Sequence, residues 1–186
     1  MVVELAKKQV KSYPLNNEND KGVPMSDTDF TRHSEQIMKD VYYKQILNVN
    51  DAYTSNENAD QVLENVKKSI SNGHRVVFGT LLDVLGKLES NNGATVRYKS
   101  QQNIDTWVVT DQVRKDAQNL DQINAGHAMV IIGYDDNAQV GNDKGVLILR
   151  NSWSADAGNN GEYYMSYEYF KLFAMEVYEI SPTPVN

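Results

Sequence analysis

The sequence contains no cysteine and no long hydrophobic run. Without thiols, its 186 residues cannot form a disulfide or a thiolate zinc site, and they cannot supply a cysteine nucleophile. The longest apolar stretches, such as 128–132 and 146–149, are far shorter than the roughly 20 residues that a membrane-spanning helix needs.

Positive charge is also scarce, with 18 basic residues against 25 acidic ones, a net charge of −7, and no basic run. Nucleic acids and anionic membranes are bound through clusters of positive charge, so we expect neither as a partner. The remaining composition, 40% hydrophobic and 23% charged, is that of a globular protein and excludes disordered and collagenous classes. Glu4 interrupts the N-terminus, which is therefore not expected to be a signal peptide.

The clearest helix is predicted over residues 59–72. Asn58 and Gln61 have the spacing of a helix cap, and Gly73 stands where a left-handed terminator belongs. The apolar side chains of this segment share one helical face: Val62, Leu63, Val66 and Ile70. Residues 75–82 follow as a short, mostly apolar and β-branched run, which predicts a buried strand.

The rest of the first two thirds gives weaker patterns. Residues 2–10 have a loosely helical apolar face, and the polar stretch 16–29 is typical of a surface loop. We expect a helix over 31–40 and a strand over 42–49. The long polar segment 83–124 predicts an elaborated surface loop.

The last third predicts strands over 128–134, 145–150 and 162–167, separated by the turn-rich spans 135–144 and 154–161. Such short connections favour an antiparallel meander. Because a helix comes first and the sheet last, without βαβ alternation, we predict an α+β fold.

Two motifs in this predicted sheet carry possible chemistry. Residues 126–136 read Gly-His-Ala-Met-Val-Ile-Ile-Gly-Tyr-Asp-Asp, and residues 149–153 read Leu-Arg-Asn-Ser-Trp. If the two strands pair, His127 and Asn151 lie side by side. An imidazole in that position can act as a general base, and an amide oxygen that accepts its other N–H fixes the ring. Trp153 can cover this hydrogen bond and exclude water.

These motifs resemble those of the papain-like cysteine peptidases, in which His-Ala, Asn-Ser-Trp and Gly-x-Asn-Gly follow in the same order. The last of these is Gly158-Asn159-Asn160-Gly161 here. Residues 64–78 are similar to the family's helix and strand before the histidine. Weaker similarity occurs at 11–15 and 165–170.

The resemblance implies a papain-like α+β fold. Its antiparallel, β-rich C-terminal subdomain would span 59–186, and 1–58 would be a remnant of the helical subdomain with a crossing segment. His127 and Asn151 would be catalytic, supported by the site residues Gly126, Ser152 and Trp153. It implies a peptide or protein substrate, no cofactor and no metal.

The sequence departs from the family at several positions. No Gln-x-x-x-Cys-Gly-x-Cys-Trp segment occurs, and counting back from His127 places the expected nucleophile before Met1, so we expect it to have been cut off rather than mutated. Ser154 replaces a common glycine, and Ala157 replaces a second tryptophan. The chain alone should therefore be inactive.

Three functions remain open at this stage. The chain is the C-terminal part of a cysteine peptidase, one chain of an active heterodimer with a cysteine-bearing partner, or an inactive papain-fold protein that binds peptides. Outside the motifs, His33 and His74 join no constellation, and the charge of His74 suits a helix C-terminus. Residues 135–136 predict a solvated turn, because their spacing fits no calcium loop.

Overall fold

The computed structural model of the protein describes six stretches of chain. They are residues 28, 32, 41–47, 58–82, 94–118 and 125–181. The helices expected over 2–10 and 31–40, the loop over 16–29 and His33 lie outside these residues, except for positions 28 and 32. Contacts divide the chain into units 1–42 and 43–186. The expected division at residue 58 stays a prediction.

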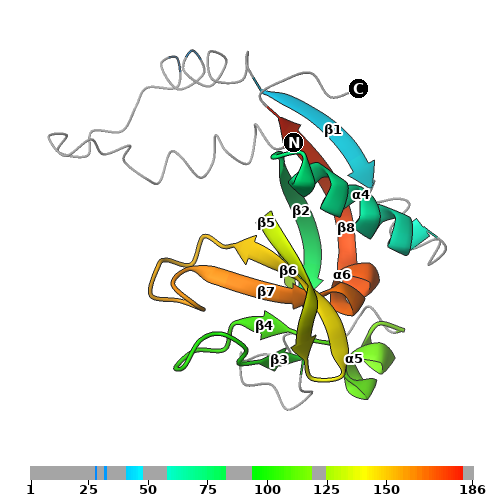
Figure 1. Cartoon of the computed structure of the whole chain (residues 1–186), viewed down its shortest axis with the longest axis vertical. Coiled ribbons are helices and arrows are strands. Elements are labelled where there is room, and N and C mark those ends of the chain that lie inside the picture. Colours follow the sequence, from blue (N-terminus) through cyan, green and yellow to red (C-terminus); the bar gives the residue numbers. More distant parts are fainter. Residues whose placement is uncertain are drawn as a thin grey trace, which may run out of the picture. The chain divides into compact units, whose positions relative to one another are not determined.

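An eight-stranded sheet dominates the second unit, in the order β1-β8-β2-β5-β6-β7-β4-β3 (Figure 1). The strands are β1 (Tyr42–Leu47), β2 (Arg75–Leu82), β3 (Thr95–Val96), β4 (Thr106–Trp107), β5 (Ala125–Val140), β6 (Asp143–Arg150), β7 (Glu162–Ser166) and β8 (Ala174–Ser181). β5, β6 and β7 are consecutive antiparallel neighbours, which confirms the predicted meander. β4 runs parallel to β7. The fold is α+β.

Among the described stretches from residue 41 onward, three helices accompany the sheet: α4 (Ala59–Ser71), α5 (Asp111–Asp116) and α6 (Tyr167–Phe173). The helix predicted over 59–72 is thus confirmed as α4, and Gly73 follows it with a φ of +80°, as expected of a left-handed terminator. The predicted cap is wrong, because the Asn58 side chain makes no capping hydrogen bond. Its backbone is close to helical already, whereas a side-chain cap requires extended geometry.

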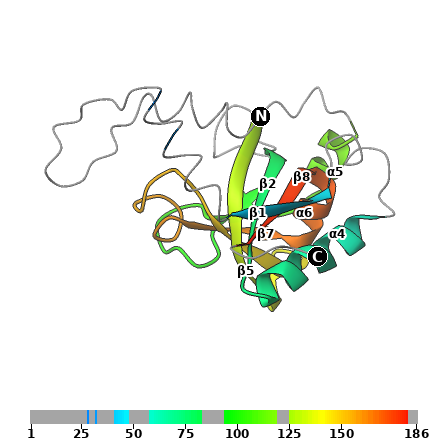
Figure 2. The same ribbon diagram turned by 90° about the horizontal axis from the view of Figure 1, so that it is seen from above.

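The main core lies between α4, α6 and one face of the sheet. Val66 in α4 and Phe78 in β2 are fully buried, and the Phe78 ring contacts that of Phe170 in α6 with centroids 5.6 Å apart. Figure 2 shows α4 and α6 together on one side of β5. β2 has the predicted bounds, and its alternate residues from Val76 onward are buried, so one strand face supplies the core.

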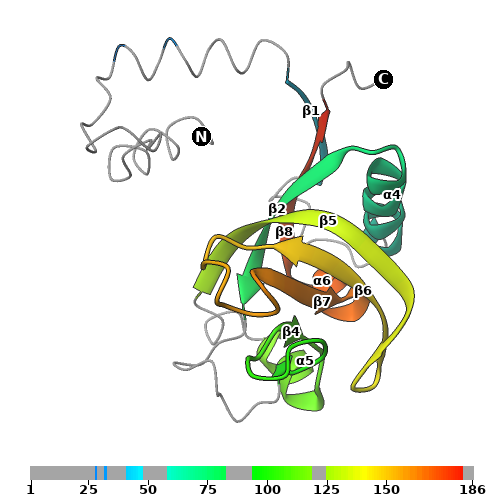
Figure 3. The ribbon, with the colours of Figure 1, turned by 60° about the vertical axis from the view of Figure 1, so that its left-hand side comes forward.

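The β5–β6 hairpin is longer than predicted (Figure 3). The expected turn over 135–144 is wrong: β5 continues to Val140, and the turn contains Gly141 with a φ of +58°. Ala138 and Val140 are buried in a second apolar cluster with Val108 and Tyr164. Tertiary burial therefore extends a strand whose local sequence favours a turn.

The described part of the expected surface loop 83–124 is also structured. It contains β3, β4 and α5, and the Trp107 side chain is 1% exposed. The Asp105 carboxylate is fully buried and accepts the backbone N–H groups of Tyr98, Lys99 and Ser100 at 2.7, 2.9 and 2.6 Å. The Asp105 side chain thus binds backbone N–H groups instead of facing water.

The third predicted strand ends one residue early. The Ser166 hydroxyl accepts the N–H of Tyr169 and caps α6, so Tyr167 begins a helix instead of ending a strand. Neither α6 nor β8 was expected from the sequence. β8 pairs antiparallel with β2.

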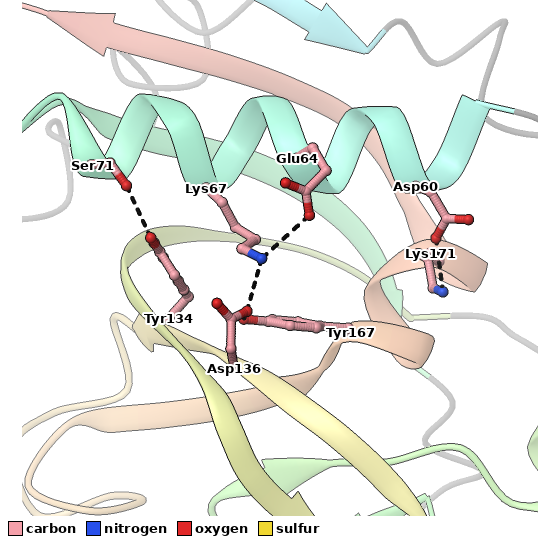
Figure 4. A network of polar contacts seen from close by, with 8 residues as sticks. All are labelled: Asp60, Glu64, Lys67, Ser71, Tyr134, Asp136, Tyr167 and Lys171. Atoms are coloured by element: carbon pink, nitrogen blue, oxygen red, sulfur yellow. Dashed lines mark hydrogen bonds and ion pairs between the residues drawn. The ribbon is translucent and has the colours of Figure 1, made fainter.

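A polar network joins α4 to the hairpin (Figure 4). Lys67 Nζ lies 2.8 Å from Asp136 Oδ1, and the Tyr167 hydroxyl donates to the same carboxylate at 2.7 Å. The ammonium of Lys67 also lies over the rings of Tyr134 and Tyr167. Asp136 is therefore an ion-paired strand residue, which corrects the predicted solvated turn at 135–136.

Candidate active site

Strand register brings His127 and Asn151 together. Arg150 is paired with Val130, so the next residue, Asn151, falls opposite Met129 at the end of β6. His127 precedes Met129 by two residues and therefore shares its sheet face. The imidazole Nε2 and the Asn151 Oδ1 are 2.9 Å apart, in the proximity that the motifs predicted.

A second hydrogen bond settles which atom donates. The Ser152 backbone N–H donates to Asn151 Oδ1 at 2.7 Å, so this oxygen is the acceptor in both contacts. The neutral His127 ring then carries its proton on Nε2, and its Nδ1 keeps a lone pair that accepts no hydrogen bond from the described residues. Ser152 thus contacts Asn151 through its backbone, while its side chain is exposed.

Trp153 covers the imidazole. The two rings are stacked, with centroids 5.0 Å apart and an interplanar angle of 24°. Trp153 is 38% exposed, so the ring that stacks on the imidazole is also in contact with solvent. Excluding water from one face strengthens the hydrogen bond beneath it.

Two buried aromatic rings support Trp153 from within the protein. Trp107 approaches it with centroids 6.3 Å apart, and Tyr163 lies nearly perpendicular to it at 5.4 Å. Burial raises the pKa of the Tyr163 phenol, with a smaller contribution from the Asp105 carboxylate. A neutral, apolar wall therefore stands behind the covering indole.

Several residues of the loop after Asn151 have a positive φ, which is the left-handed region of backbone conformation. Gly158 and Gly161 have φ of +59° and +80°, and a Cβ at Gly158 would lie 2.5 Å from the backbone oxygen of Glu162. Ser154 has a φ of +88°, so the replacement of the expected glycine places a side chain in strained backbone. Ala157 is partly buried against the main core.

Gly126, the remaining predicted site residue, lies opposite Leu81 of β2. A Cβ there would meet no atom within 4 Å, so nothing in the structure explains a need for glycine at this position.

Sequence reasoning missed the contacts that the 94–118 segment makes with the site loop. Asn103 Nδ2 donates to the backbone oxygens of Asp156 and Gly158 at 3.0 and 3.1 Å. With the Trp107 ring, this gives the segment two separate contacts to the loop that carries Trp153. Nothing in the sequence indicates that Trp107 and Trp153 meet, because their contact depends on the pairing of β4 with β7.

His74 lies after α4 as predicted, but its main partner is a carboxylate. Its Nδ1 is 2.5 Å from Glu179 Oε1, and the Glu179 side chain is buried. Residue 74 precedes β2, whereas His127 pairs with Thr80 near the other end of that strand. The pair therefore belongs to the packing of β2 against β8.

The described residues hold no group of three or more side chains suited to bind a metal ion. Among the same residues, no helix is long and apolar enough to cross a membrane.

Chemically, the described site offers an oriented imidazole with one free nitrogen. Nδ1 can accept a proton from an acid, and the imidazolium so formed can return it to a leaving group. The chain contains no thiol to serve as that acid.

Comparisons with known proteins agree with the motifs. The family model described as "Peptidase C1-like family" matches residues 6–181. No curated protein gives a significant match.

Similar solved structures share low sequence identity with the chain. They include PepW from Lactobacillus rhamnosis, with 20% identity and a TM-score of 0.41 over 64% of this chain and 26% of that one. Xylellain, a cysteine protease from Xylella fastidiosa, has 22% identity and a TM-score of 0.40 over 67% of this chain and 37% of that one. SERA5E from Plasmodium falciparum has 17% identity and a TM-score of 0.44 over 94% and 52%. The chain thus spans between about a quarter and about half of these structures.

Proposed function

The chain belongs to the Peptidase C1-like family, and from this premise we propose that it supplies the general base and the orienting amide of a papain-like cysteine peptidase. The observation that carries the proposal is the pair of hydrogen bonds to Asn151 Oδ1, from His127 Nε2 and from the Ser152 N–H. Together they leave Nδ1 of the imidazole free for a thiol.

The nucleophile in this proposal is a cysteine from outside the 186 residues, either in a preceding segment or in a partner chain. Its S–H proton passes to Nδ1 of His127, and the thiolate attacks the carbonyl carbon of a peptide bond. When the tetrahedral intermediate collapses, the C–N bond breaks and the imidazolium gives its proton to the leaving amine. Water then hydrolyses the acyl-enzyme, with Nδ1 again accepting a proton.

Asn151 orients the base in this scheme, and Trp153 shields the hydrogen bond that does so. The role of Asn151 is smaller than that of His127, because a mispositioned imidazole can still accept protons while an absent one cannot. The substrate is a peptide or protein, and neither a cofactor nor a metal takes part.

The test is to supply the missing thiol. The 186 residues alone should neither hydrolyse peptides nor react with thiol-directed peptidase inhibitors, since no sulfhydryl is present. Joined to the segment or chain that carries the cysteine, the protein should gain both properties. His127→Ala should then reduce kcat by about 10² to 10⁴. An equally fast His127→Ala protein would overturn the proposal.

The alternative function, a papain-fold protein that binds peptides without cleaving them, is favoured by the lack of any cysteine in these 186 residues. It predicts that no cysteine-bearing chain accompanies the protein in its cells. It also predicts that peptides bind to the chain alone and quench the fluorescence of Trp153, which is 38% exposed. Peptide binding without any His127-dependent turnover in the protein purified from its own cells would favour this alternative.

A further inference from the structure

We propose that Trp107 is a positioning residue for the His127–Asn151 pair and acts through Trp153. The inference deepens the proposed function and rests on it for its catalytic consequence. Three ring contacts carry it: His127 stacks on Trp153 at 5.0 Å, Trp153 meets Trp107 edge-on at 6.3 Å, and Trp107 stacks on Tyr163 at 5.4 Å.

Trp153 needs such support because of where it lies. It follows β6 in a segment without regular structure, is 38% exposed, and precedes a residue held at a φ of +88°. An exposed indole on such a loop has several rotamers available, and the observed one stacks on the imidazole. Trp107 is 1% exposed and gives the indole a fixed wall on its inner side.

Trp107 is itself held firmly. β4 pairs in parallel with β7 and places Trp107 opposite Met165, a fully buried residue. Just before it, the Asp105 carboxylate binds the backbone N–H groups of residues 98–100. Asn103 ties the same segment to the backbone oxygens of Asp156 and Gly158. Because these contacts hold Trp107 in place, its ring limits the conformations of the loop that it contacts.

The loop after Trp153 gives an independent reason why the indole packs against rings from other segments. Ala157 in this loop is partly buried against the same apolar cluster that contains Trp107 and Tyr163. Residues 154–161 contain no aromatic side chain, so the buried rings that contact Trp153 come from outside this loop. Trp107, from a segment about 50 residues earlier in the chain, supplies one of these rings, and Tyr163 supplies the other.

The indole nitrogen of Trp107 indicates which property of the side chain matters. Nε1 is buried and finds no hydrogen-bond partner among the described residues. The contribution of Trp107 is therefore the contact made by its ring, and another aromatic ring should preserve part of it. Trp107→Phe is accordingly the conservative variant, and Trp107→Leu is the disruptive one.

The matched control is Tyr98→Leu. Tyr98 lies in the same segment, but its ring contacts Tyr164 at 5.3 Å and packs against the second apolar cluster, not against Trp153. This substitution removes an aromatic contact from the segment without changing any of the rings that connect His127, Trp153, Trp107 and Tyr163. A general loosening of the segment would thus affect both leucine variants alike.

The measurement is NMR of the His127 ring in the 186-residue chain. We expect Trp107→Leu to accelerate solvent exchange of the Nε2–H proton at least tenfold and to shift the ring protons, which feel the ring current of Trp153. Trp107→Phe should retain most of the protection, and Tyr98→Leu should leave both signals unchanged. If Trp107→Leu fails to fold, Trp107→Phe and Trp107→Tyr provide the comparison with Tyr98→Leu.

Unchanged His127 signals in a folded Trp107→Leu protein, or equal changes in Tyr98→Leu, would overturn the inference. If the leucine variant does not fold, Trp107→Phe and Trp107→Tyr are measured in its place. His127 exchange rates and ring-proton shifts that match those of Tyr98→Leu in both variants would also overturn the inference. Because this readout needs no thiol, it is independent of the proposed function. In the thiol-complemented protein, Trp107→Leu should lower kcat about fivefold to tenfold with KM little changed. A complemented protein without His127-dependent turnover would instead refute the proposed function.

Discussion

Lys67 Nζ in α4 lies 2.8 Å from Asp136 Oδ1 in β5, and this ion pair joins the helix to the long hairpin of the sheet. The pKa of the Asp136 carboxyl is lowered by its hydrogen bond with Lys67 and then by that with the Tyr167 hydroxyl. The pKa of Lys67 is raised, chiefly by Asp136. Both ionised forms are favoured in the folded protein.

Asp136→Asn should lower the free energy of unfolding at pH 7 by about 0.5 to 1 kcal/mol, a modest value because the pair is screened by solvent. The lowered pKa means that the folded protein binds this proton less readily than the unfolded chain. The stabilisation is therefore present above the unfolded pKa of about 3.9 and is lost as the pH falls through the folded value. Urea unfolding at pH 7 and pH 3 measures it.

The difference in unfolding free energy between wild type and Asp136→Asn should be smaller at pH 3 than at pH 7. Asp135→Asn is the control, because the Asp135 carboxylate accepts only a local N–H from Asn137 among the hydrogen bonds described. A difference between wild type and Asp136→Asn that is the same at both pH values would contradict the account of this pair.

Gly145→Ala should destabilise the protein by more than about 2 kcal/mol. Gly145 has a φ of +83°, and a Cβ there would overlap the ring of Tyr167, which is buried against it. Gly126→Ala is the control, since its Cβ would meet no atom within 4 Å. Thermal or urea unfolding of the two variants should differ clearly. Equal stabilities would show that the Tyr167 ring does not lie over Gly145.

Ser154→Gly should stabilise the protein by about 0.5 to 1 kcal/mol, because glycine adopts a positive φ without the strain that a side chain brings. The gain is limited by the freedom that glycine adds to the unfolded chain and by the loss of the Ser154 hydroxyl as an acceptor for the Asp156 N–H. Ser154→Ala, which keeps the strain, should not be stabilising. The urea midpoints of both variants decide between these outcomes, and a stabilising alanine would contradict the strain.

His74→Ala should destabilise by about 3 kcal/mol, because the buried Glu179 carboxylate loses its partner. The double variant His74→Ala with Glu179→Leu removes that uncompensated group and should recover much of the loss. A double-mutant cycle on unfolding free energies measures the coupling. If the two single effects simply add, the two side chains are not coupled.

The parts of the structure that could be predicted are those with local causes. The apolar spacing of α4 and the β-branched run of β2 each determine their element almost alone. His127 and Asn151 could be paired because the two motifs lie on consecutive strands that form one antiparallel hairpin. Asp136 was misassigned because its partner, Lys67, comes from a helix far away in sequence. Trp107 was missed for the same reason: its contact with Trp153 depends on how β4 joins β7.

The most direct test of the account is the protonation of the His127 ring, read from its nitrogen-15 chemical shifts in the neutral form. Hydrogen bonding to Asn151 Oδ1 at 2.9 Å predicts a proton on Nε2 and a free lone pair on Nδ1. Asn151→Ala should weaken that preference, with both forms observed. A neutral ring protonated on Nδ1 in the wild-type chain would contradict the central claim, because the nitrogen needed to accept the thiol proton would already be occupied.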